Sequence, residues 1–279
     1  MPYKDFLDTL SAPRGGVYKR VFRTQTHEEL SGAVLWGQEV SMVLQSLMVT
    51  FEVVLRNRIH SSLSLQATKG SPVASHSFAW YDHLLNGTRK LEGETFAKVE
   101  AILCDAQGIR LNVQPSPDRV IARLSLGVWP NILDQQLSTQ AIEAKTFKDV
   151  FPFHPRANKH WNHQDNRKDA VAVLKDVRAW RNRISHCKPV WSEGWYRNSV
   201  SQHWTEVLNR VTSRRAAMLE VLQWMCPKTY QVYSNSFSGK LFEALMTEDS
   251  VMDHITATVA CPPYPAANAT LLAAYKQRP

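Results

Sequence analysis

The apolar positions of the chain recur at helical spacing, most clearly between residues 171 and 191. At spacings of three, four and three residues, the seam of this predicted amphipathic helix is formed by Leu174, Val177, Arg181 and Ile184. Arg181 is the polar member of that seam. A guanidinium at a core-facing position is costly to desolvate unless it is paired or used. The arginine therefore needs either a structural partner or a function.

Arg181 belongs to a polar group near the end of this helix, called here the Arg181 cluster and formed by Arg181, Asn182 and His186. Pro189 lacks an N–H and restricts the residue before it, so we expect the helix to end at about Lys188. His186 then lies in the last turn, next to solvent. At about 100° per residue, Asn182 and His186 share a face, whereas Arg181 and His186 are offset by roughly 140°.

Two interpretations of the Arg181 cluster are open. In the structural one, Arg181 pairs with a carboxylate, Asn182 satisfies backbone groups, and His186 is a cation favoured by the helix dipole. In the functional one, the three side chains form a reactive site, either because the last turn unwinds or because a second copy of the chain completes it.

A second long helix is predicted for residues 26–66, where Thr26 and Glu29 form a capping-box pattern. Gly32 and Gly37 are the places where this helix could bend or divide. Between residues 44 and 65 the apolar side chains lie nearly all round the helix, so we expect much of it to be buried.

The polar residues of that buried stretch are Glu52, Arg56 and Asn57. Glu52 and Arg56 are four residues apart in the favourable order, which makes a structural ion pair the simplest reading. The alternative is that all three residues support Arg181 from behind. His60 follows Arg56 at one residue fewer than the spacing from Arg181 to His186, so we do not expect a second, equal site there.

The remaining apolar patterns predict further helices and no β-sheet, so the fold class is all-α. We expect a short helix around 78–85, helices at 95–106, 117–124, 138–150, 199–225 and 239–246, and a break at 126–133 where Trp129 is a core anchor. Prolines and the Gly15-Gly16 pair suggest a loose arm at 1–25. A single helical domain is expected for 26–248, followed by a partly disordered tail at 249–279.

The chain is basic, with a formal net charge of +8 and a sequence pI of about 9.4, which favours polyanionic partners. Its four cysteines are scattered without any disulfide-framework spacing, as is typical of a reducing cytosol. The start has no apolar leader, and no stretch of about 18 uninterrupted apolar residues follows. We therefore expect a soluble, cytoplasmic protein that does not engage a membrane.

The segment 151–163 holds three histidines not far in sequence from His186 and Cys187. They are His154, His160 and His163. Their spacing matches no familiar metal site and two prolines interrupt it, so we expect no metal. Arg156 and Trp161 are residue types that contact phosphates and stack on bases, although a basic loop leading into the next helix is an equal alternative. The chain also lacks the motifs of P-loop, α/β-hydrolase and zincin enzymes.

Three segments carry a resemblance to a known family. The motif RNRISHCKPVW resembles the R-N-x-x-x-H signature of the HEPN superfamily, specifically of its Abi-like (abortive-infection) proteins. FEVVLRNRIH at 51–60 and ARLSLGVWPNIL at 122–133 resemble the same family in the same order. The resemblance covers roughly residues 28–191, is vague to about Leu245, and is not found in the tail.

This resemblance implies a HEPN-like helical bundle with additional helices and a metal-independent endoribonuclease activity without cofactors. His186 would move a proton, since an imidazole titrates near neutrality, and Arg181 would bind the scissile phosphate. Asn182 would orient either group. The products would be a 2′,3′-cyclic phosphate and a 5′-hydroxyl. Supporting residues would be Glu52, Arg56 and Asn57, and substrate contacts would come from Lys188, Arg178 and Arg183.

The resemblance further implies RNA as the partner, a twofold homodimer that brings two motifs together, and phage defence or toxin–antitoxin biology with an antitoxin protein or small RNA. The sequence departs from the pattern at Cys187 and Lys188, where a second histidine and an acidic residue often follow the motif histidine. A non-catalytic helical module, in which the Arg181 cluster is a structural network and the basic surface binds RNA or another partner, is the alternative.

Overall fold

The computed structural model of the chain describes residues 2–10, 12–69, 71, 75–82, 91, 93–134, 140–191 and 201–256. Every regular element in these ranges is a helix, and β-structure there is confined to one isolated bridge between Cys104 and Arg110. The all-α class predicted from the sequence is therefore confirmed.

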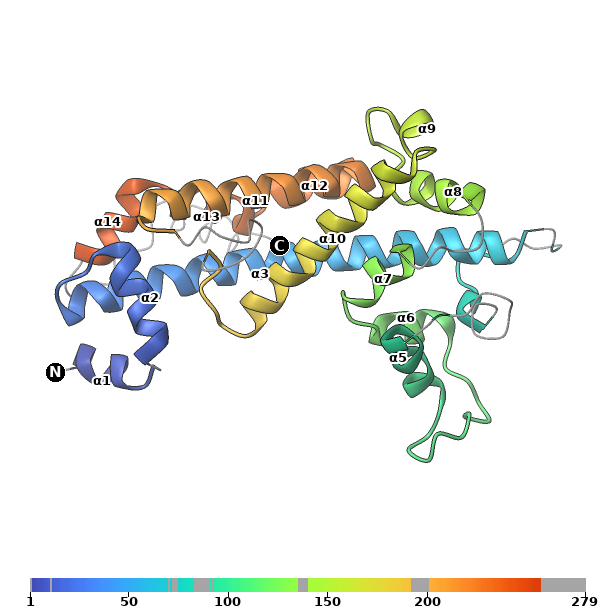
Figure 1. Cartoon of the computed structure of the whole chain (residues 1–279), viewed down its shortest axis with the longest axis horizontal. Coiled ribbons are helices and arrows are strands. Elements are labelled where there is room, and N and C mark those ends of the chain that lie inside the picture. Colours follow the sequence, from blue (N-terminus) through green and yellow to red (C-terminus); the bar gives the residue numbers. More distant parts are fainter. Residues whose placement is uncertain are drawn as a thin grey trace, which may run out of the picture. The chain divides into compact units, whose positions relative to one another are not determined.

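Thirteen helices have defined bounds within the described residues (Figure 1). They are α1 (Pro2–Asp8), α2 (Ala12–Phe22), α3 (His27–Ala67), α5 (Gly93–Leu103), α6 (Pro117–Arg123), α7 (Val128–Asp134), α8 (Gln140–Val150), α9 (Ala157–His160), α10 (Gln164–Ser185), α11 (Trp204–Met225), α12 (Pro227–Ser234), α13 (Phe237–Leu245) and α14 (Glu248–Thr256).

The chain divides into two compact units. Unit 1 comprises residues 1–43, 187–213 and 240–279, and unit 2 comprises residues 44–186 and 214–239. This division differs from the single domain expected for 26–248, because the N-terminal residues and the C-terminal helices join the first part of α3 in a core of their own.

The predicted capping box starts α3 and is confirmed. The hydroxyl of Thr26 accepts the backbone N–H of Glu29 at 3.2 Å, and the Glu29 carboxylate accepts the N–H groups of Gln25 at 2.6 Å and Thr26 at 3.4 Å. These bonds satisfy donors that a helix start leaves open. From there α3 runs without a break for 41 residues, so neither Gly32 nor Gly37 divides it.

An aromatic cluster forms the core of unit 1. The ring centroids of Tyr18 and Trp191 lie 5.1 Å apart, those of Phe22 and Trp36 5.5 Å, and those of Trp36 and Trp191 5.7 Å. Tyr18 and Phe22 belong to α2, so the expectation of a loose arm at 1–25 was wrong. Large buried aromatic rings contribute enough apolar burial to hold this segment, despite the two glycines inside its helix.

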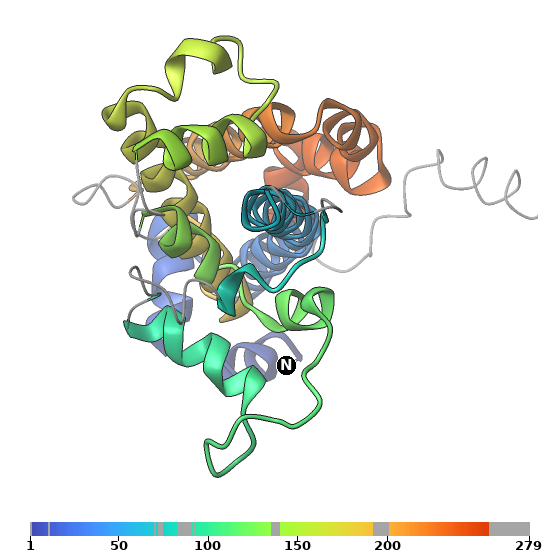
Figure 2. The same ribbon diagram turned by 90° about the vertical axis from the view of Figure 1, so that its right-hand side faces the viewer.

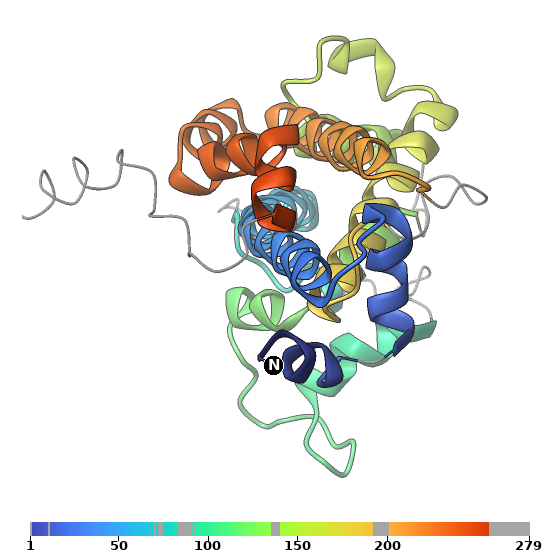
Figure 3. The same ribbon diagram turned by 90° about the vertical axis from the view of Figure 1, so that its left-hand side faces the viewer.

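The start of the expected tail is also helical. In α14, Val251 and Ile255 are buried, and His254 lies 3.2 Å from the Glu39 carboxylate of α3. The approach is so close that a Cβ at Gly32 would overlap the His254 carbonyl oxygen, which is why a glycine is needed there. Figure 3 shows α14 in red beside the first part of α3 in blue. The tail prediction thus fails for 249–256, and residues 257–279 lie outside the described range.

Unit 2 is built around the C-terminal part of α3, whose buried side chains include Leu47, Phe51, Leu55 and Ile59. Figure 2 looks along this helix and shows α6, α7 and α8 arranged around it. α10 packs on α7 and α8, and α5 packs on α6 and α7. α6 begins as predicted, with Ser116 before a proline in the first turn.

The segment 126–133, predicted as a break, contains helix α7 instead. Val128, Trp129, Ile132 and Leu133 are buried in it. Pro130 lies in its first turn, where the missing N–H has no helical partner to lose, so the proline does not prevent the helix. Trp129 is fully buried, which confirms it as a core anchor.

Within the described residues, α3 is long and apolar enough to cross a membrane by length and composition. A core helix of a globular protein passes the same test. The buried positions of α3 in both units provide such a core role.

Candidate functional site

The predicted seam of α10 is buried, and Arg181 lies at its edge. Val171, Leu174, Val177 and Trp180 are buried along α10. The Arg181 side chain keeps 24% of its surface exposed. Desolvation of the guanidinium is therefore incomplete, and a ligand can still reach it.

Glu52 of α3 is the carboxylate that faces Arg181. Their closest side-chain atoms, Arg181 Nη2 and Glu52 Oε2, are 3.9 Å apart, and the Glu52 side chain is 21% exposed. Arg181 Nη1 also donates a hydrogen bond of 3.1 Å to Asn182 Oδ1. Arg181 thus contacts a carboxylate on another helix and the amide of its own neighbour, both at the edge of the core.

The loop before α7 joins this arrangement. The backbone N–H of Leu126 donates a hydrogen bond to the Glu52 carboxylate. At the next residue, Gly127, an added Cβ would lie 2.7 Å from Nε of Arg178, so the glycine lets that guanidinium lie against the loop. The three segments that carry the family resemblance therefore meet around Glu52 and Arg181.

Glu52 has an unusual electrostatic setting. Burial raises the pKa of its carboxyl, while Arg181, Arg56 and the Leu126 N–H oppose the rise without cancelling it. Arg56 lies close enough to act on Glu52, and its buried Nε has no hydrogen-bond partner. Glu52 is therefore held by two cations but is easier to protonate than an ordinary glutamate.

His186 lies at the C-cap of α10 and is exposed. Its backbone N–H donates a hydrogen bond of 3.0 Å to the carbonyl oxygen of Asn182, which links it to the arginine's neighbour. The helix ends at Ser185, three residues earlier than predicted, because Cys187 takes a left-handed conformation with φ 51°. The proline at 189 only follows this end.

Other predicted site residues lie apart from the Arg181–Glu52 contact. Asn57 is exposed on α3, whereas it was expected to pack behind Arg181. Arg183 is half-buried two residues beyond Arg181 on α10. Lys188 is exposed and belongs to unit 1, whereas the cluster belongs to unit 2.

His60 is a buried structural histidine, in keeping with its exclusion as an equal site. Its Nδ1 accepts a hydrogen bond of 2.8 Å from Trp80 Nε1, an atom that can only donate. Its Nε2 lies 3.5 Å from the Ser77 hydroxyl and 3.6 Å from the Asp118 carboxylate. Burial lowers the pKa of His60 despite the nearby Asp118.

Two of the three histidines of 151–163, His154 and His160, pack together in a loop, while His163 is exposed. The His154 and His160 rings stack with centroids 4.1 Å apart, and His154 also lies 4.6 Å from the Trp224 ring. Trp161 is fully buried, so the expectation that it could stack on a base was wrong. No group of three or more histidine, cysteine or acidic side chains suited to a metal is found in the part of the chain that the structure describes.

Sequence reasoning overlooked Arg167, which is also on α10. Its side chain is 5% exposed and donates hydrogen bonds to the Trp161 carbonyl at 2.7 Å and to the Glu143 carboxylate at 3.2 Å. A signal was present, since Arg167 precedes Val171 and Leu174 at seam spacings of four and seven. With every interaction internal, Arg167 serves the fold.

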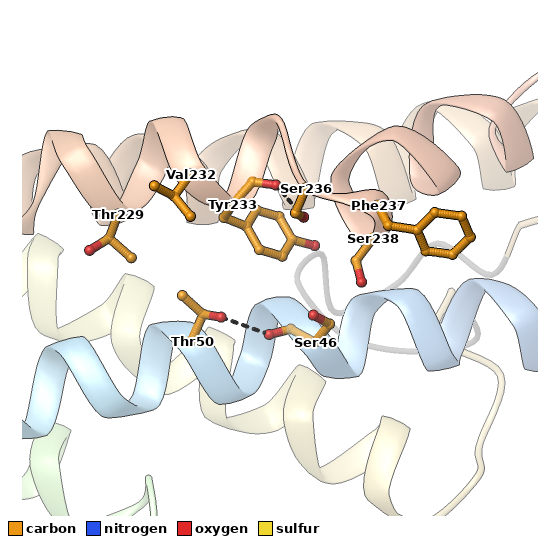
Figure 4. A pocket seen from close by; sticks show the side chains of 8 residues that line it. All are labelled: Ser46, Thr50, Thr229, Val232, Tyr233, Ser236, Phe237 and Ser238. Carbon is orange, nitrogen blue, oxygen red and sulfur yellow. Dashed lines mark hydrogen bonds between the residues drawn. The ribbon is translucent and has the colours of Figure 1, made fainter. Parts of the chain in front are cut away.

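A separate pocket of about 280 Å³ lies between α3 and the α12–α13 region (Figure 4). Serine, threonine and tyrosine hydroxyls line it, together with Val232 and Phe237, and no charged residue contributes. Without a cation it is unsuited to a phosphate, so it does not compete with the Arg181 cluster as a nucleic-acid site.

No family model matches the chain, and no curated protein and no solved structure matches it. What the site offers chemically is a partly exposed guanidinium with a bound amide, a half-buried carboxyl, and an imidazole at the end of the same helix. These are the groups that bind a phosphodiester and transfer a proton.

Proposed function

We propose that this protein is a metal-independent endoribonuclease of the HEPN type, with a HEPN-like bundle in unit 2. The observation that carries the proposal is the meeting of the three resembling segments: Glu52 of α3, Leu126 before α7 and Arg181 of α10 interact directly. Three segments that are distant in sequence thus share both a family pattern and one polar contact, which supports a common functional role.

In the proposed reaction RNA supplies its own nucleophile. His186 removes the proton of the 2′-OH as that oxygen attacks the adjacent phosphorus, and the bond to the 5′-oxygen breaks. Arg181 binds the phosphate oxygens and stabilises their developing charge. The 5′-oxygen takes up a proton, which leaves a 2′,3′-cyclic phosphate and a 5′-hydroxyl. Asn182 holds the Arg181 guanidinium through its Oδ1.

The half-buried carboxyl of Glu52 keeps Arg181 oriented toward the phosphate, with Arg56 behind it. Arg178 and Arg183 contribute further contacts to RNA. We propose that a twofold homodimer completes the site in the cytoplasm, and that the protein acts in phage defence or as a toxin restrained by an antitoxin.

A second candidate function is a non-catalytic RNA-binding or assembly module. The contact of Arg181 with both Glu52 and Asn182 favours it, because a structural network would satisfy the arginine in the same way. The two functions differ in the role of His186. In the nuclease it transfers a proton, whereas in the non-catalytic module it is only a residue at the end of a helix.

Cleavage of a mixed RNA pool in EDTA separates these functions. Wild type is compared with His186→Ala and with His163→Ala, which removes the exposed histidine at the opposite end of the same helix. The nuclease predicts cyclic-phosphate ends from wild type and His163→Ala and their loss in His186→Ala, with unchanged thermal unfolding. Equal cleavage by all three proteins, or cleavage by none, would contradict the proposed role of His186 and favour the second function.

A further inference from the structure

Phe153 is an exposed aromatic residue on a loop flanked by prolines, and its surroundings are basic. It is 53% exposed, although the neighbouring Phe151 and Trp161 are buried. Its backbone N–H donates a hydrogen bond of 3.0 Å to the Trp224 carbonyl oxygen. Prolines at 152 and 155 restrict the backbone on both sides. The ring is therefore held outward at little entropic cost, which is what a preformed contact requires.

A guanidinium accompanies the ring. The Arg58 Cζ atom of α3 lies 6.0 Å from the Phe153 ring centroid, at the outer range of a cation–π contact. Because more than half of Phe153 remains exposed, Arg58 does not cover the ring. The exposed Arg156 follows Phe153 by three residues on the same loop.

The basic character extends to the start of α12. Burial alone would raise the pKa of the Cys226 thiol, but hydrogen bonds from Thr229, together with the nearby Arg58, lower it. Arg58 therefore lies near this helix start, where Lys228 is exposed. We name this group the Phe153 surface: Phe153, Arg58, Arg156 and Lys228.

Negative charge near the Phe153 surface is sparse. Between residues 151 and 169 the chain has four lysines and arginines and two acidic residues, Asp165 and Asp169. The neighbouring carboxylates of α8 are engaged elsewhere, Glu143 with Arg167 and Asp149 with Lys145. An anionic partner would thus meet few carboxylates beside Arg58, Arg156 and Lys228.

We propose that the Phe153 surface binds single-stranded RNA, with one unstacked base on the Phe153 ring and phosphates on Arg58, Arg156 and Lys228. An exposed ring among cations is the combination that single-stranded nucleic acids use, since every base has a π-face and every linkage a negative charge. A duplex keeps its bases stacked internally and can use only the cations.

This surface is distinct from the Arg181 cluster. Arg58 lies six residues after Glu52 on α3, about 9 Å along the helix axis and about 120° round it. The inference rests on the proposed function for the choice of RNA, and it adds a second contact that only a strand longer than a dinucleotide can reach.

Binding is tested with a labelled 2′-O-methyl 12-nucleotide RNA, which lacks the 2′-OH and cannot be cleaved by the proposed reaction. Fluorescence anisotropy should show Phe153→Ala weakened about fivefold or more, the loss typical of one stacked base. Arg58→Gln should lower the salt slope of binding by about 0.7, as for one lost phosphate contact. The matched controls are Phe237→Ala, at a residue 58% exposed, and Arg119→Gln, an exposed residue of α6.

Binding of Phe153→Ala within twofold of wild type, equal weakening by Phe237→Ala, or no binding of this RNA by wild type would each overturn the proposal. A hairpin duplex should bind without dependence on Phe153. Cleavage of the dinucleotide UpA should be unchanged in Phe153→Ala. A protein that binds RNA through Phe153 but never cleaves it would contradict the proposed nuclease and leave the proposed surface standing. A protein that cleaves RNA but binds it equally well without Phe153 would contradict the proposed surface and leave the nuclease standing.

Discussion

Two arginines of α10, Arg167 and Arg181, each face a glutamate, yet they are held very differently. Arg167 is 5% exposed, bonds to the Glu143 carboxylate at 3.2 Å and also donates to a backbone carbonyl. Arg181 is 24% exposed and its nearest approach to Glu52 is 3.9 Å. A fully enclosed pair leaves nothing for a ligand, whereas a loose, half-exposed pair can exchange its partner for a phosphate. Burial, more than the presence of a partner, therefore separates a structural arginine from one that is available to a ligand.

The largest effect is expected for Arg167→Ala. Breaking this pair leaves the Glu143 carboxylate, whose side chain is only 13% exposed, without its cation, so the free energy of unfolding should fall by about 3–5 kcal/mol. Arg181→Ala should cost about 1 kcal/mol or less, because its pair is partly solvated. Urea unfolding measures both. The double variant Arg167→Met/Glu143→Leu should recover most of the loss, and equal costs at the two arginines would remove the distinction.

Next in size is the effect of Arg181→Lys on RNA cleavage. A lysine keeps the charge but not the two parallel donors that a guanidinium offers a phosphate, so kcat/KM should fall by about 100-fold. Arg119→Lys on the surface of α6 is the control and should cleave normally. The thermal unfolding midpoint should be unchanged in both. A fully active Arg181→Lys protein would show that charge alone suffices and that the fork geometry is irrelevant.

A smaller effect is expected for Glu52→Gln. Because burial raises the pKa of Glu52 against the pull of two arginines, a neutral amide should be tolerated, and stability should change by about 1 kcal/mol or less. The amide still accepts the Leu126 N–H but no longer orients Arg181 by charge, so cleavage should fall by about tenfold. Strong destabilisation with unchanged cleavage would assign Glu52 to the fold instead, beside Glu143.

The smallest effect is the dependence of stability on pH, which arises from histidines of unit 2 that are buried in neutral form. Burial lowers the pKa values of His60, His154 and His160 in the folded protein. The unfolded chain binds protons at a higher pH, near 6.5, so stability is present at neutral pH and declines as the pH falls below that value. The urea midpoint should therefore drop between pH 7.5 and 5.5.

His160→Gln provides the control for this pH effect. The variant removes one of the three titrating rings and the neighbour that lowers the pKa of His154, so its urea midpoint should depend less on pH than that of wild type. An identical pH slope in the two proteins would show that the stacked pair does not contribute to acid sensitivity.

Predictions from the sequence were confirmed where they depend on residues that lie close together in the chain. The capping box before α3, the proline start of α6 and the apolar seam of α10 each depend on residues within a turn or two of one another. The same kind of reading failed for α2 and α7, where glycines or a proline argued against a helix. Tertiary burial of Tyr18 and Trp129 outweighed those local preferences, because packing energies exceed helix propensities.

The sequence alone was enough to predict the helical class, a buried seam that includes Arg181, and the polar residues of α3 that could serve it. Which of these polar residues contacts Arg181 depends on the tertiary structure: Glu52 faces Arg181, while Asn57 is exposed to solvent. The structure also shows that Trp161, the residue predicted to be able to stack on a base, is enclosed, whereas Phe153 is exposed. The physical reason is that helical periodicity assigns a residue to a face, whereas burial of that face depends on helices far away in the chain.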